Sequence, residues 1–388
     1  MKILLVTPYY PIPNRKDLLF DTKAMHYFAK YWAKQGHEVA VLHMYFHTFN
    51  ITNIHKYKLH FGHRIVENFL DGVRILMMEN RIFHRLKIVA AMQQKLAAKR
   101  YNKILAKDTD FDVMLVHIPS FYDAFVKNLD FTGKRIAVLH MSDVKAINSG
   151  RIDADNISKF YDAIGYRSNS IKNVFDKKID STKCTFMVYS GAPDFYSRNE
   201  SKNFFTDDTV NILYVGKLIK LKKIDVVLKA LAEIEAKHNF HFTIVGNGEE
   251  EVTLKKLTYG LSLEEKVTFA GSLERQQVIE KMFESDIFVM ISSPETFGLV
   301  YLEAMSQGCI TIGSKGEGID GVINDGENGF LVESGNVKEL TVCLNNICDM
   351  SIEKCKELSL KAKKTASRMS EKSMAEVYLN NVIANVNK

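Results

Sequence analysis

The sequence has little of the residue types that define several protein classes. Its 388 residues include only 6 Pro and 21 Gly, which excludes collagen-like and low-complexity chains. The five cysteines are odd in number and form no Cys-x-x-Cys pair, so they predict a reduced, cytoplasmic protein without a zinc site. No run of about 18 apolar residues occurs, and the apolar stretch at the N-terminus is too short for a signal peptide. Any membrane contact is therefore expected to be peripheral.

The composition that remains is that of a globular protein large enough for two domains. Basic residues number 52 and acidic residues 46, and the formal net charge of +6 is too weak a bias in a chain of this length to indicate nucleic-acid binding. No basic motif interleaved with aromatic residues supports such binding either. We expect no nucleic-acid partner.

Short β-branched runs alternate with helical patterns along the whole chain, which is typical of βα units with parallel sheets. Strands are predicted at 2–6, 38–43, 73–78, 112–118, 135–140, 163–166 and 185–189, and again at 211–215, 241–245, 266–270, 286–291 and 309–313. The pattern predicts an α/β protein of two Rossmann-like, doubly wound domains whose strand carboxyl ends face a central cleft. The expected parts are an N-terminal domain (1–192), a linker (193–208), a C-terminal domain (209–368) and a last helix (369–388) that packs back on the N-terminal domain.

The segment 292–308 is the densest candidate for chemistry, because it follows a predicted strand and opens a predicted helix. Glu295 lies in the loop, and Gly298 allows backbone to approach a ligand closely. The amides from Phe297 to Val300 are the unpaired donors of a helix N-terminus, which favours an anion. Glu303 lies about one turn into the helix, where its carboxylate can accept hydrogen bonds from vicinal hydroxyls. The alternative is an acidic helix start capped by Ser293, with Glu303 in solvent.

The run Pro-Glu-Thr-Phe-Gly-Leu-Val-x-Leu-Glu-Ala-Met at 294–305 resembles the Glu-x7-Glu signature of the retaining glycosyltransferases of family 4, which have the GT-B fold. The resemblance implies that Glu295 contacts the hydroxyls of a donor sugar and that Glu303 holds the ribose. It also implies that the backbone after Glu295 holds the donor diphosphate, through Thr296, Phe297, Gly298, Leu299 and Val300.

The segment 214–223 resembles the Gly-Arg-Leu-x-x-x-Lys-Gly segment of the same family. Gly216 matches its first glycine, Lys217 stands in the Arg position, Lys222 in the Lys position, and Lys223 replaces the last Gly. The resemblance implies that Lys217 and Lys222 neutralise the donor phosphates and the leaving diphosphate. A lysine lacks the planar fork of an arginine, so diphosphate binding is expected to differ. The alternative is a solvated lysine run at a helix start.

Three further glycine-containing loops follow strands of the second half. Gly246 and Gly248 resemble the family's Gly-x-Gly turn facing the nucleoside, although a tight βα turn would look the same. Gly271 and Ser272 resemble the loop whose backbone reads the edge of the base. The stretch from 314–318 to 329–332 resembles the family's later glycine-rich segment.

The first half resembles the family less closely. His140, in the segment 137–144, matches a Leu-His-Gly-Thr-Asp segment whose His faces the donor sugar, so it is a candidate for a polar contact or for handling the acceptor proton. His117 also follows a strand and is a candidate on the acceptor side; for both, a structural histidine is the alternative. The first loop lacks the family's adjacent glycines. There Asn14, Arg15 and Lys16 are candidates for the acceptor or the donor phosphates, or belong to a plain surface loop.

Two Asp-x-Asp triplets, 108–110 and 153–155, could be mistaken for a metal site of another glycosyltransferase fold. Neither follows a strong hydrophobic strand, so we interpret them as loop acids. No metal and no cofactor are expected, because the lysines are predicted to balance the charge that a cation would otherwise balance.

The segment 81–107 is predicted to be a basic amphipathic helix without any Asp or Glu. Its basic residues include Arg85, Lys87, Lys95, Lys99, Arg100 and Lys103, and Phe83, Leu86, Ala90, Ala97, Ile104 and Leu105 supply apolar positions. Such a helix could rest on an anionic membrane at the inner face of the plasma membrane. The alternative is a helix that uses its apolar face to dock on its own sheet.

The resemblance as a whole implies a retaining, metal-independent glycosyltransferase. It would transfer a sugar from a nucleotide-sugar, a UDP-sugar in our interpretation, to a hydroxyl of a saccharide or lipid-linked saccharide in polysaccharide or glycoconjugate synthesis. The residues assigned to catalysis are His140, Lys217, Lys222 and Glu295. Two alternatives stay open: a nucleotide-sugar epimerase of the same fold, and a binding-only or partner-dependent subunit, for which the glycine-free first loop and Lys217 argue.

Overall fold

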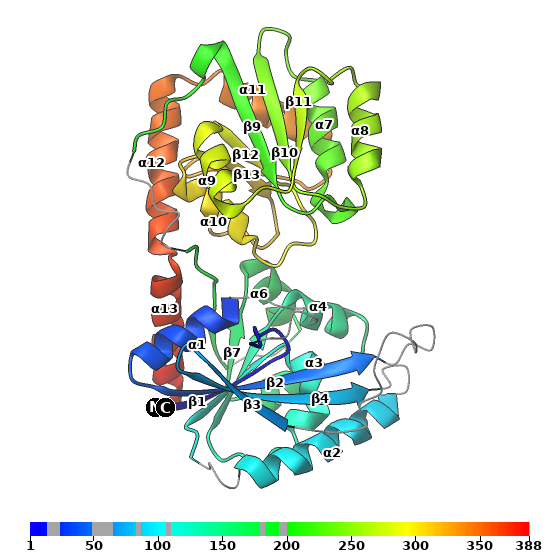
Figure 1. Ribbon diagram of the computed structural model, residues 1–388, viewed down its shortest axis with the longest axis vertical. Helices are drawn as coiled ribbons and strands as arrows, with labels where there is room; N and C mark the ends of the chain where they lie inside the picture. The colour runs from blue at the N-terminus through cyan, green and yellow to red at the C-terminus, as the bar shows by residue number, and fades with distance from the viewer. Residues whose placement is uncertain are drawn as a thin grey trace. The chain divides into compact units, whose positions relative to one another are not determined.

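The computed structural model describes residues 1–13, 24–48, 65–82, 87–105, 110–178, 183–193 and 200–387. The chain divides into two compact units, each built around its own sheet (Figure 1). Unit 1 comprises Met1–Arg167, Ile171–Val188 and Met374–Lys388, and unit 2 comprises Ser168–Ser170 and Tyr189–Ser373. Across the described ranges, none of the helices is long and apolar enough to cross a membrane.

Unit 1 contains an eight-stranded sheet in the order β3-β4-β2-β1-β5-β6-β7-β8. All neighbouring pairs are parallel except β3 with β4, which form an antiparallel hairpin. The strands are β1 (Lys2–Thr7), β2 (Glu38–Thr48), β3 (Ile65–Leu70), β4 (Val73–Ile82), β5 (Val113–His117), β6 (Lys134–Leu139), β7 (Ala163–Tyr166) and β8 (Cys184–Met187).

Helices cover both faces of this sheet. One face carries α1 (Ala24–Lys34) and the last helix of the chain, α13 (Glu371–Val386). The other face carries α2 (Lys87–Leu105), α3 (Pro119–Val126), α4 (Met141–Asn148), α5 (Ala154–Phe160) and α6 (Asn169–Asp176).

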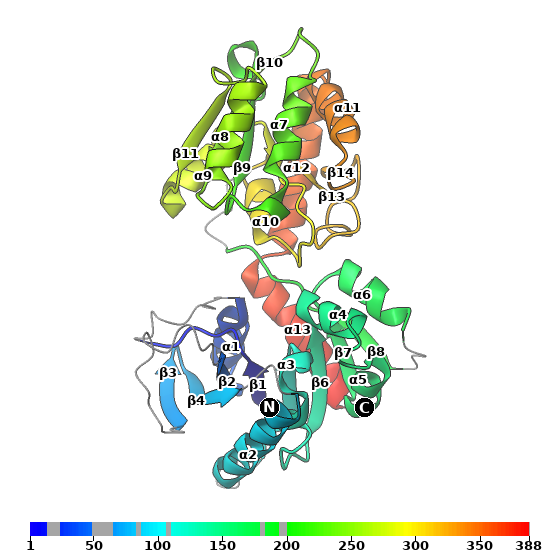
Figure 2. The ribbon, with the colours of Figure 1, turned by 90° about the vertical axis from the view of Figure 1, so that its right-hand side faces the viewer.

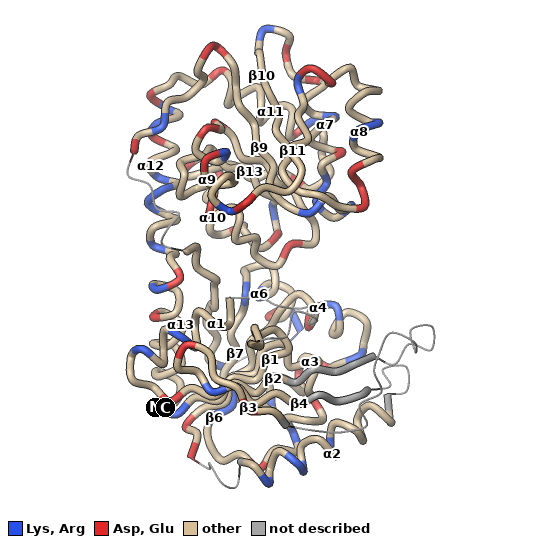
Figure 3. Tube along the Cα trace, viewed as in Figure 1, with Lys and Arg blue, Asp and Glu red and all other residues tan. Residues whose placement is uncertain are grey.

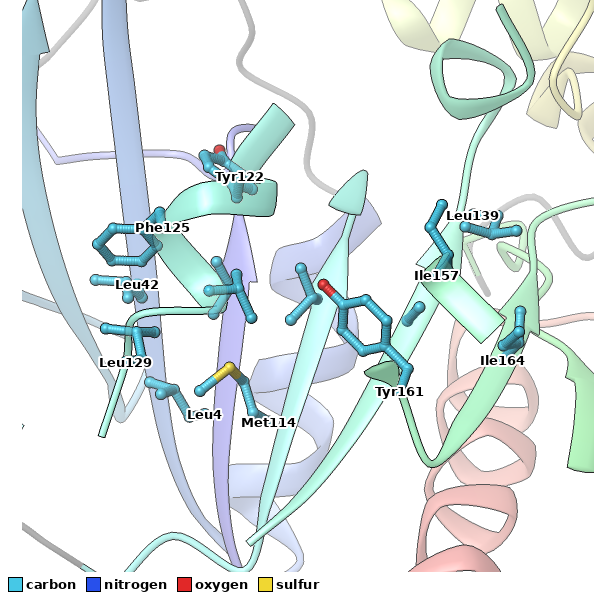
Figure 4. Packing of buried hydrophobic residues seen from close by; sticks show 14 of the residues in the cluster. Leu4, Leu42, Met114, Tyr122, Phe125, Leu129, Leu139, Ile157, Tyr161 and Ile164 are labelled. Carbon is cyan, nitrogen blue, oxygen red and sulfur yellow. The ribbon is translucent and has the colours of Figure 1, made fainter. Parts of the chain in front are cut away.

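The strands of unit 1 are buried on both sides, which explains their nearly continuous apolar sequences. In β1, Leu4 and Val6 belong to the core on the α2 side, whereas Ile3 and Leu5 belong to the core on the α1 side. Figure 4 shows how Leu4, Met114 and neighbouring apolar side chains fill the first of these cores. Side chains that alternate between two filled layers leave no polar face on the strand.

Helix α13 is part of the unit 1 core although it lies more than 300 residues from α1. The Trp32 indole N–H donates to the Ala375 carbonyl at 2.9 Å. The Tyr378 ring packs edge-on against Phe28 and Trp32, with centroids 5.3 and 5.1 Å apart. The end of the chain therefore supplies one layer of the first unit.

Unit 2 contains a six-stranded parallel sheet in the order β11-β10-β9-β12-β13-β14. Its strands are β9 (Thr209–Val215), β10 (Asn239–Val245), β11 (Val267–Gly271), β12 (Ile287–Val289), β13 (Ile310–Ser314) and β14 (Phe330–Val332). Its helices are α7 (Ile224–Ala232), α8 (Glu251–Gly260), α9 (Arg275–Glu284), α10 (Leu299–Ser306), α11 (Val337–Cys348) and α12 (Ile352–Arg368).

Contacts between helices separate those of unit 2 into two layers. Helix α7 contacts α8 and α11, whereas α10 contacts α9 and α12. Figure 2 shows both layers beside the sheet. With helices on both faces and the strand order reversing between β9 and β12, unit 2 is doubly wound, as the sequence pattern predicts.

The structure differs from the sequence-based expectations at the segment 200–208, which is not a free linker. Lys202 and Phe204 are buried, and the Lys202 ammonium donates to the carbonyls of Met282 and Phe283 at 2.9 and 2.7 Å. These carbonyls lie in the last turn of α9, where a cation is favoured by the helix dipole. The segment is thus tied to unit 2.

The units divide at 188/189 and 373/374 rather than at the expected 192/193 and 368/369. Ala192 explains the shift, because its amide donates to the Met369 carbonyl and its carbonyl accepts from the Glu371 amide, both at 2.9 Å. These backbone bonds hold 189–193 and 369–373 together within unit 2. Two strands, β3 and β14, have no counterpart among the predicted ones.

Candidate functional site

Two loops of unit 2 leave adjacent strands at the point where the strand order reverses. The loop after β9 contains residues 216–223, and the loop after β12 contains residues 290–298. In doubly wound sheets ligands bind outside the carboxyl ends of the strands at this switch point. The two segments singled out for charge and carboxylate chemistry therefore flank the same switch point.

Lys222 and Glu295 form an ion pair between these two loops. The Lys222 ammonium is 2.6 Å from Glu295 Oε2, and the Ser292 hydroxyl donates to the same oxygen at 3.1 Å. Side-chain exposure is 21% for Lys222 and 15% for Glu295, so the pair is partly shielded from solvent. Partial shielding strengthens an ion pair relative to the same pair in open water. Lys222 and Glu295, both predicted to be catalytic, are thus in direct contact with each other.

A second glutamate, which the motif analysis did not single out, holds the Glu295 loop from the other side. Glu317 accepts from the Ser293 hydroxyl at 2.6 Å and from the Glu295 amide at 2.7 Å. The Gly318 amide donates to the Glu295 carbonyl at 3.1 Å. A Cβ on Gly318 would overlap the Thr296 carbonyl and the Phe297 nitrogen, so only glycine allows this approach. The signal in the sequence is the triplet Gly316-Glu317-Gly318.

The start of α10 is built around Gly298. Gly298 has φ 78°, and a Cβ there would overlap the Tyr301 ring, so this position also requires glycine. Phe297 is buried, with its ring 5.5 Å from that of Tyr189. Leu299 and Val300 form the first turn of α10.

Two backbone features bear on the predicted diphosphate contacts. The Thr296 amide donates to Glu295 Oε1 at 3.1 Å, so this amide is already engaged. Within the described residues, no acceptor is recorded for the amides of Phe297, Gly298 and Leu299. The amides without an acceptor therefore begin at Phe297, whereas the set that the resemblance implies begins at Thr296.

Glu303, on α10, is paired with a residue that sequence reasoning missed. Arg275 at the start of α9 places its Nη2 3.7 Å from Glu303 Oε1. Exposure is 48% for Arg275 and 16% for Glu303. Glu303 is therefore neither a free solvated acid nor deeply buried, and its carboxylate lies in a fixed place beside a cation.

Gly246 and Gly248 have a packing role that the structure makes visible. A Cβ on Gly246 would overlap the Gly216 carbonyl, and a Cβ on Gly248 would overlap the Leu218 backbone. The Leu218 amide donates to the Asn247 carbonyl at 2.8 Å. These glycines let the loops after β9 and β10 pack backbone to backbone. The loop after β11 continues this contact, because the Gly271 carbonyl accepts from the Gly246 amide at 2.8 Å and Ser272 is exposed next to it.

Three lysines of the loop after β9 carry charge without a nearby counter-ion. Lys217 and Lys220 are exposed and Lys223 is partly exposed, and no ion pair involves any of them within the described part of the chain. The Tyr214 hydroxyl holds the Lys217 carbonyl at 2.9 Å. The loop therefore presents a concentration of positive charge beside the Lys222–Glu295 pair.

His117 and His140 form a hydrogen-bonded pair in unit 1. His117 Nδ1 is 3.0 Å from His140 Nε2, and His117 Nε2 is 3.2 Å from the Tyr378 hydroxyl. His117, expected on the acceptor side, is buried, and its ring lies between the His140 ring and the Tyr378 hydroxyl. Asp143 fixes the backbone here by accepting from the His140 amide at 2.8 Å and the Ser120 amide at 2.9 Å.

Burial holds both imidazoles neutral at pH 7. It lowers the pKa of His117 and of His140 well below the usual 6.5, and the Arg167 guanidinium adds to the effect in both. A base with a strongly lowered pKa is a weak proton acceptor. Of the two roles considered for His140, the lowered pKa suits a polar contact better than accepting a proton.

The remaining candidates on the acceptor side, Asn14, Arg15 and Lys16, lie outside the described residues. Of the Asp-x-Asp triplets, 108–110 is described only at Asp110. In the other, the Asp153 carboxylate accepts from the Asp155 amide at 3.1 Å and caps α5, and Asp155 pairs with Lys159 at 2.5 Å. The carboxylates of this triplet therefore cap a helix and pair with a lysine.

Comparison with known proteins identifies the class of protein to which the chain belongs. Residues 196–365 match the family of glycosyl transferases group 1. The N-acetyl-alpha-D-glucosaminyl L-malate synthase of Bacillus anthracis is 27% identical over 289 residues, which are 71% of this chain and 72% of that protein. Further transferases match over 26–49% of their own length.

Two solved structures share the fold over nearly the whole chain. The lipopolysaccharide outer core galactosyltransferase WaaB has a TM-score of 0.72 at 17% identity, covering 99% of each chain. Anabaena HepE, in complex with UDP and glucose, has a TM-score of 0.64 at 17% identity, covering 99% of this chain and 100% of HepE. The fold is GT-B, unit 2 carries a glycosyl transferases group 1 domain, and the chain is a glycosyltransferase enzyme.

The contact of Gly318 with the Glu295 loop yields a test of how the site is held. In Gly318→Ala, the new methyl group must displace the Thr296–Phe297 backbone, so we expect the free energy of unfolding to fall by about 1–3 kcal/mol, as for overpacking in a rigid interior. Denaturant unfolding followed by circular dichroism measures this loss. The control Gly260→Ala adds a methyl group where nothing lies within 4 Å and φ is ordinary. Equal effects of both substitutions would contradict the assigned role.

Lys223 yields a second test, because it adopts a backbone conformation that favours glycine. Glycine is the residue at this position in the family segment that 214–223 resembles. Its φ is 55° at the N-cap of α7, where a side chain costs about 1–2 kcal/mol. Since glycine loses more entropy on folding, Lys223→Gly should stabilise unit 2 by up to about 1 kcal/mol. Lys220→Gly, in the preceding turn and without a positive φ, should destabilise it instead. Denaturant unfolding followed by circular dichroism measures both; destabilisation by Lys223→Gly would count against strain.

The neutral histidine pair predicts that unit 1 loses stability on acidification. Below about pH 6.5 the unfolded chain binds protons that folded His117 and His140 do not, so stability falls as pH falls, by up to about 1.4 kcal/mol per pH unit per histidine. Trp32, the sole tryptophan, lies in this core and reports its unfolding by fluorescence. Between pH 7.5 and 5.5, His117→Gln should lose less stability than the wild type. His241→Gln, on β10 of unit 2, should leave the slope unchanged, and a slope unaffected by His117→Gln would refute the assignment.

Proposed function

We propose that the protein is a retaining, metal-independent glycosyltransferase of family 4. It transfers a sugar from a nucleotide-sugar, a UDP-sugar, to a hydroxyl of a saccharide or lipid-linked saccharide in the synthesis of a cell-surface polysaccharide or glycoconjugate. The Lys222–Glu295 pair at the switch point of unit 2 carries the proposal, because it places a cation for phosphate beside a carboxylate for sugar hydroxyls.

The charge of the site suits a diphosphate leaving group. Lys217, Lys220 and Lys223 have no ion-pair partner among the described residues, and Lys222 has only Glu295. When donor binds, the Lys222 ammonium exchanges the Glu295 carboxylate for a phosphate oxygen, and Glu295 then accepts from donor hydroxyls. The open amides at the start of α10 add neutral donors to the same anion.

In the proposed step, the acceptor hydroxyl oxygen forms a bond to the anomeric carbon while the bond from that carbon to the phosphate oxygen breaks. The acceptor proton passes to the departing phosphate oxygen on the same face of the sugar, so the configuration is retained. Lys217 and Lys222 balance the charge that develops on the diphosphate. Glu295 orients the sugar.

The nucleoside is assigned to the rest of unit 2. Glu303, held beside Arg275, accepts from the ribose hydroxyls, and the loops at Gly246–Gly248 and Gly271–Ser272 contact the base through backbone. The choice of UDP is supported by HepE, a protein of the same fold that is described with UDP and glucose. A saccharide acceptor is supported by the fold shared with a lipopolysaccharide core galactosyltransferase.

The test is donor hydrolysis and transfer in the presence of EDTA, with UDP-glucose, UDP-galactose, UDP-N-acetylglucosamine and the corresponding GDP-sugars. At least one UDP-sugar should release UDP without a metal. Glu295→Gln should reduce this rate at least 100-fold, because it removes a charge that orients the reacting sugar. The control is Glu357→Gln on α12. Glu357 is also paired with a lysine, Lys361, at 2.6 Å, and its replacement should leave the rate within twofold of the wild type.

Three outcomes would overturn parts of the proposal. Undiminished release of UDP by Glu295→Gln would remove that residue from the site. A product whose anomeric configuration, followed by NMR, differs from that of the donor would exclude retention. Binding of UDP by calorimetry without turnover of any donor would favour the binding-only alternative, and conversion of a UDP-sugar to its epimer without acceptor would favour the epimerase.

A further inference from the structure

Helix α2 presents three large apolar side chains to solvent along one line. Ile88, Met92 and Leu96 are 79, 58 and 54% exposed, and their spacing of four residues places them one above another on the helix surface. No other helix of the described ranges has three exposed large apolar residues. Single exposed apolar residues are common, but a line of three points to a contact.

The same face of α2 carries its positive charge. Lys95, Lys99, Arg100 and Lys103 are exposed, and at about 100° per residue they fall with the three apolar residues in an arc of about 140°. The helix has no Asp or Glu, which Figure 3 shows as blue segments without red along α2. None of the four cations has an ion pair to any residue that the structure describes. The charge of this face is therefore uncompensated.

The opposite face of α2 already fulfils the helix's role in the fold. Ala97, Ala98 and Tyr101 are buried in the core, and the Tyr101 hydroxyl donates to the Leu76 carbonyl on β4 at 3.1 Å. Gln94 bonds the backbone of α3 twice, donating to the Phe121 carbonyl at 3.0 Å and accepting from the Phe125 amide at 3.1 Å. The exposed face is not needed for docking on the sheet.

This arrangement corrects the helical pattern expected from the sequence. Ala97, assigned there to the apolar face, is buried, and Ala90 and Ile104 are partly buried, so that set is the docked face. The side chains of Phe83, Leu86 and Leu105 lie outside the described residues. The exposed apolar line of Ile88, Met92 and Leu96 was not part of the expected pattern, and it lies among the cations instead of opposite them.

We propose that the outward face of α2, residues Ile88, Met92, Lys95, Leu96, Lys99, Arg100 and Lys103, docks on an anionic lipid surface. Aliphatic side chains enter the boundary between headgroups and acyl chains, while the flanking cations contact anionic headgroups. Each cation near such a surface raises the partition coefficient about fivefold, so four contribute several hundredfold. Nucleic acid fits less well, because the face has no aromatic side chain on which a base could stack.

The test measures binding of the full chain to vesicles of phosphatidylcholine alone or with 30% phosphatidylglycerol, by co-sedimentation at low and at 0.5 M salt. The wild type should bind the anionic vesicles at least tenfold more strongly than the neutral ones, and less strongly at high salt. Ile88→Gln/Met92→Gln/Leu96→Gln and Lys95→Gln/Lys99→Gln/Lys103→Gln should each lose at least tenfold. Their unfolding midpoints should match the wild type, because all six positions face solvent.

The matched control is Lys356→Gln/Lys364→Gln/Lys372→Gln, which removes an equal number of positive charges, three, from exposed sites in unit 2. It should bind within twofold of the wild type. Equal binding of wild type to neutral and anionic vesicles, or an equal loss in the control, would overturn the proposal, as would loss in neither α2 variant. No sugar or nucleotide is present, so failure here is distinguishable from failure of the proposed reaction, which donor hydrolysis in solution tests separately.

Discussion

The backbone contact between Gly318 and the Glu295 loop is the constraint on which the site depends. Glu295 has its amide and carbonyl bound by Glu317 and Gly318, at 2.7 and 3.1 Å, before its side chain meets Lys222. A carboxylate on an unsupported loop would sample many positions, and groups must be held closely for efficient chemistry. The packing that excludes any side chain at 318 thus fixes where the charged pair can lie.

The fold was predictable where burial left a clear pattern. Strands such as β1 and β5 are buried on both faces and read as unbroken apolar runs, so the two sheets could be inferred. Strand β3 was missed because its exposed residues do not form a polar face: Val66 and Phe69 are exposed although apolar, and the polar Glu67 and Asn68 lie between them. The turn that joins it to β4, Asp71-Gly72 with φ 50° and 80°, is nevertheless a hairpin signal available in the sequence. Strand β14 has three residues, too few to show a period.

The site was predictable in its residues and less so in its contacts. The motifs named Lys222 and Glu295, 73 positions apart, and the structure brings them to 2.6 Å. Spacing could not show that Arg275 pairs with Glu303, because that contact depends on how α9 and α10 pack. His117 had the expected strand end but not the expected exposure, since helix α13, brought from the far end of the chain, covers it with Tyr378. Long-range packing decides each of these cases.

The net charge of +6 conceals two separate accumulations of positive charge. One lies in the loop after β9 of unit 2, where Lys217, Lys220 and Lys223 have no acidic partner among the described residues and Lys222 pairs with Glu295. The other lies on α2 of unit 1, where the exposed cations have no acidic partner in the part of the chain that the structure describes. Elsewhere lysines are commonly matched, as in Lys281–Glu284 and Lys361–Glu357. Uncompensated like charges repel each other, and the two proposed anionic ligands, a diphosphate and lipid headgroups, would relieve this repulsion. The two sites differ in what accompanies the charge: glycines and open amides suit a compact diphosphate, and an aliphatic line suits an extended lipid surface.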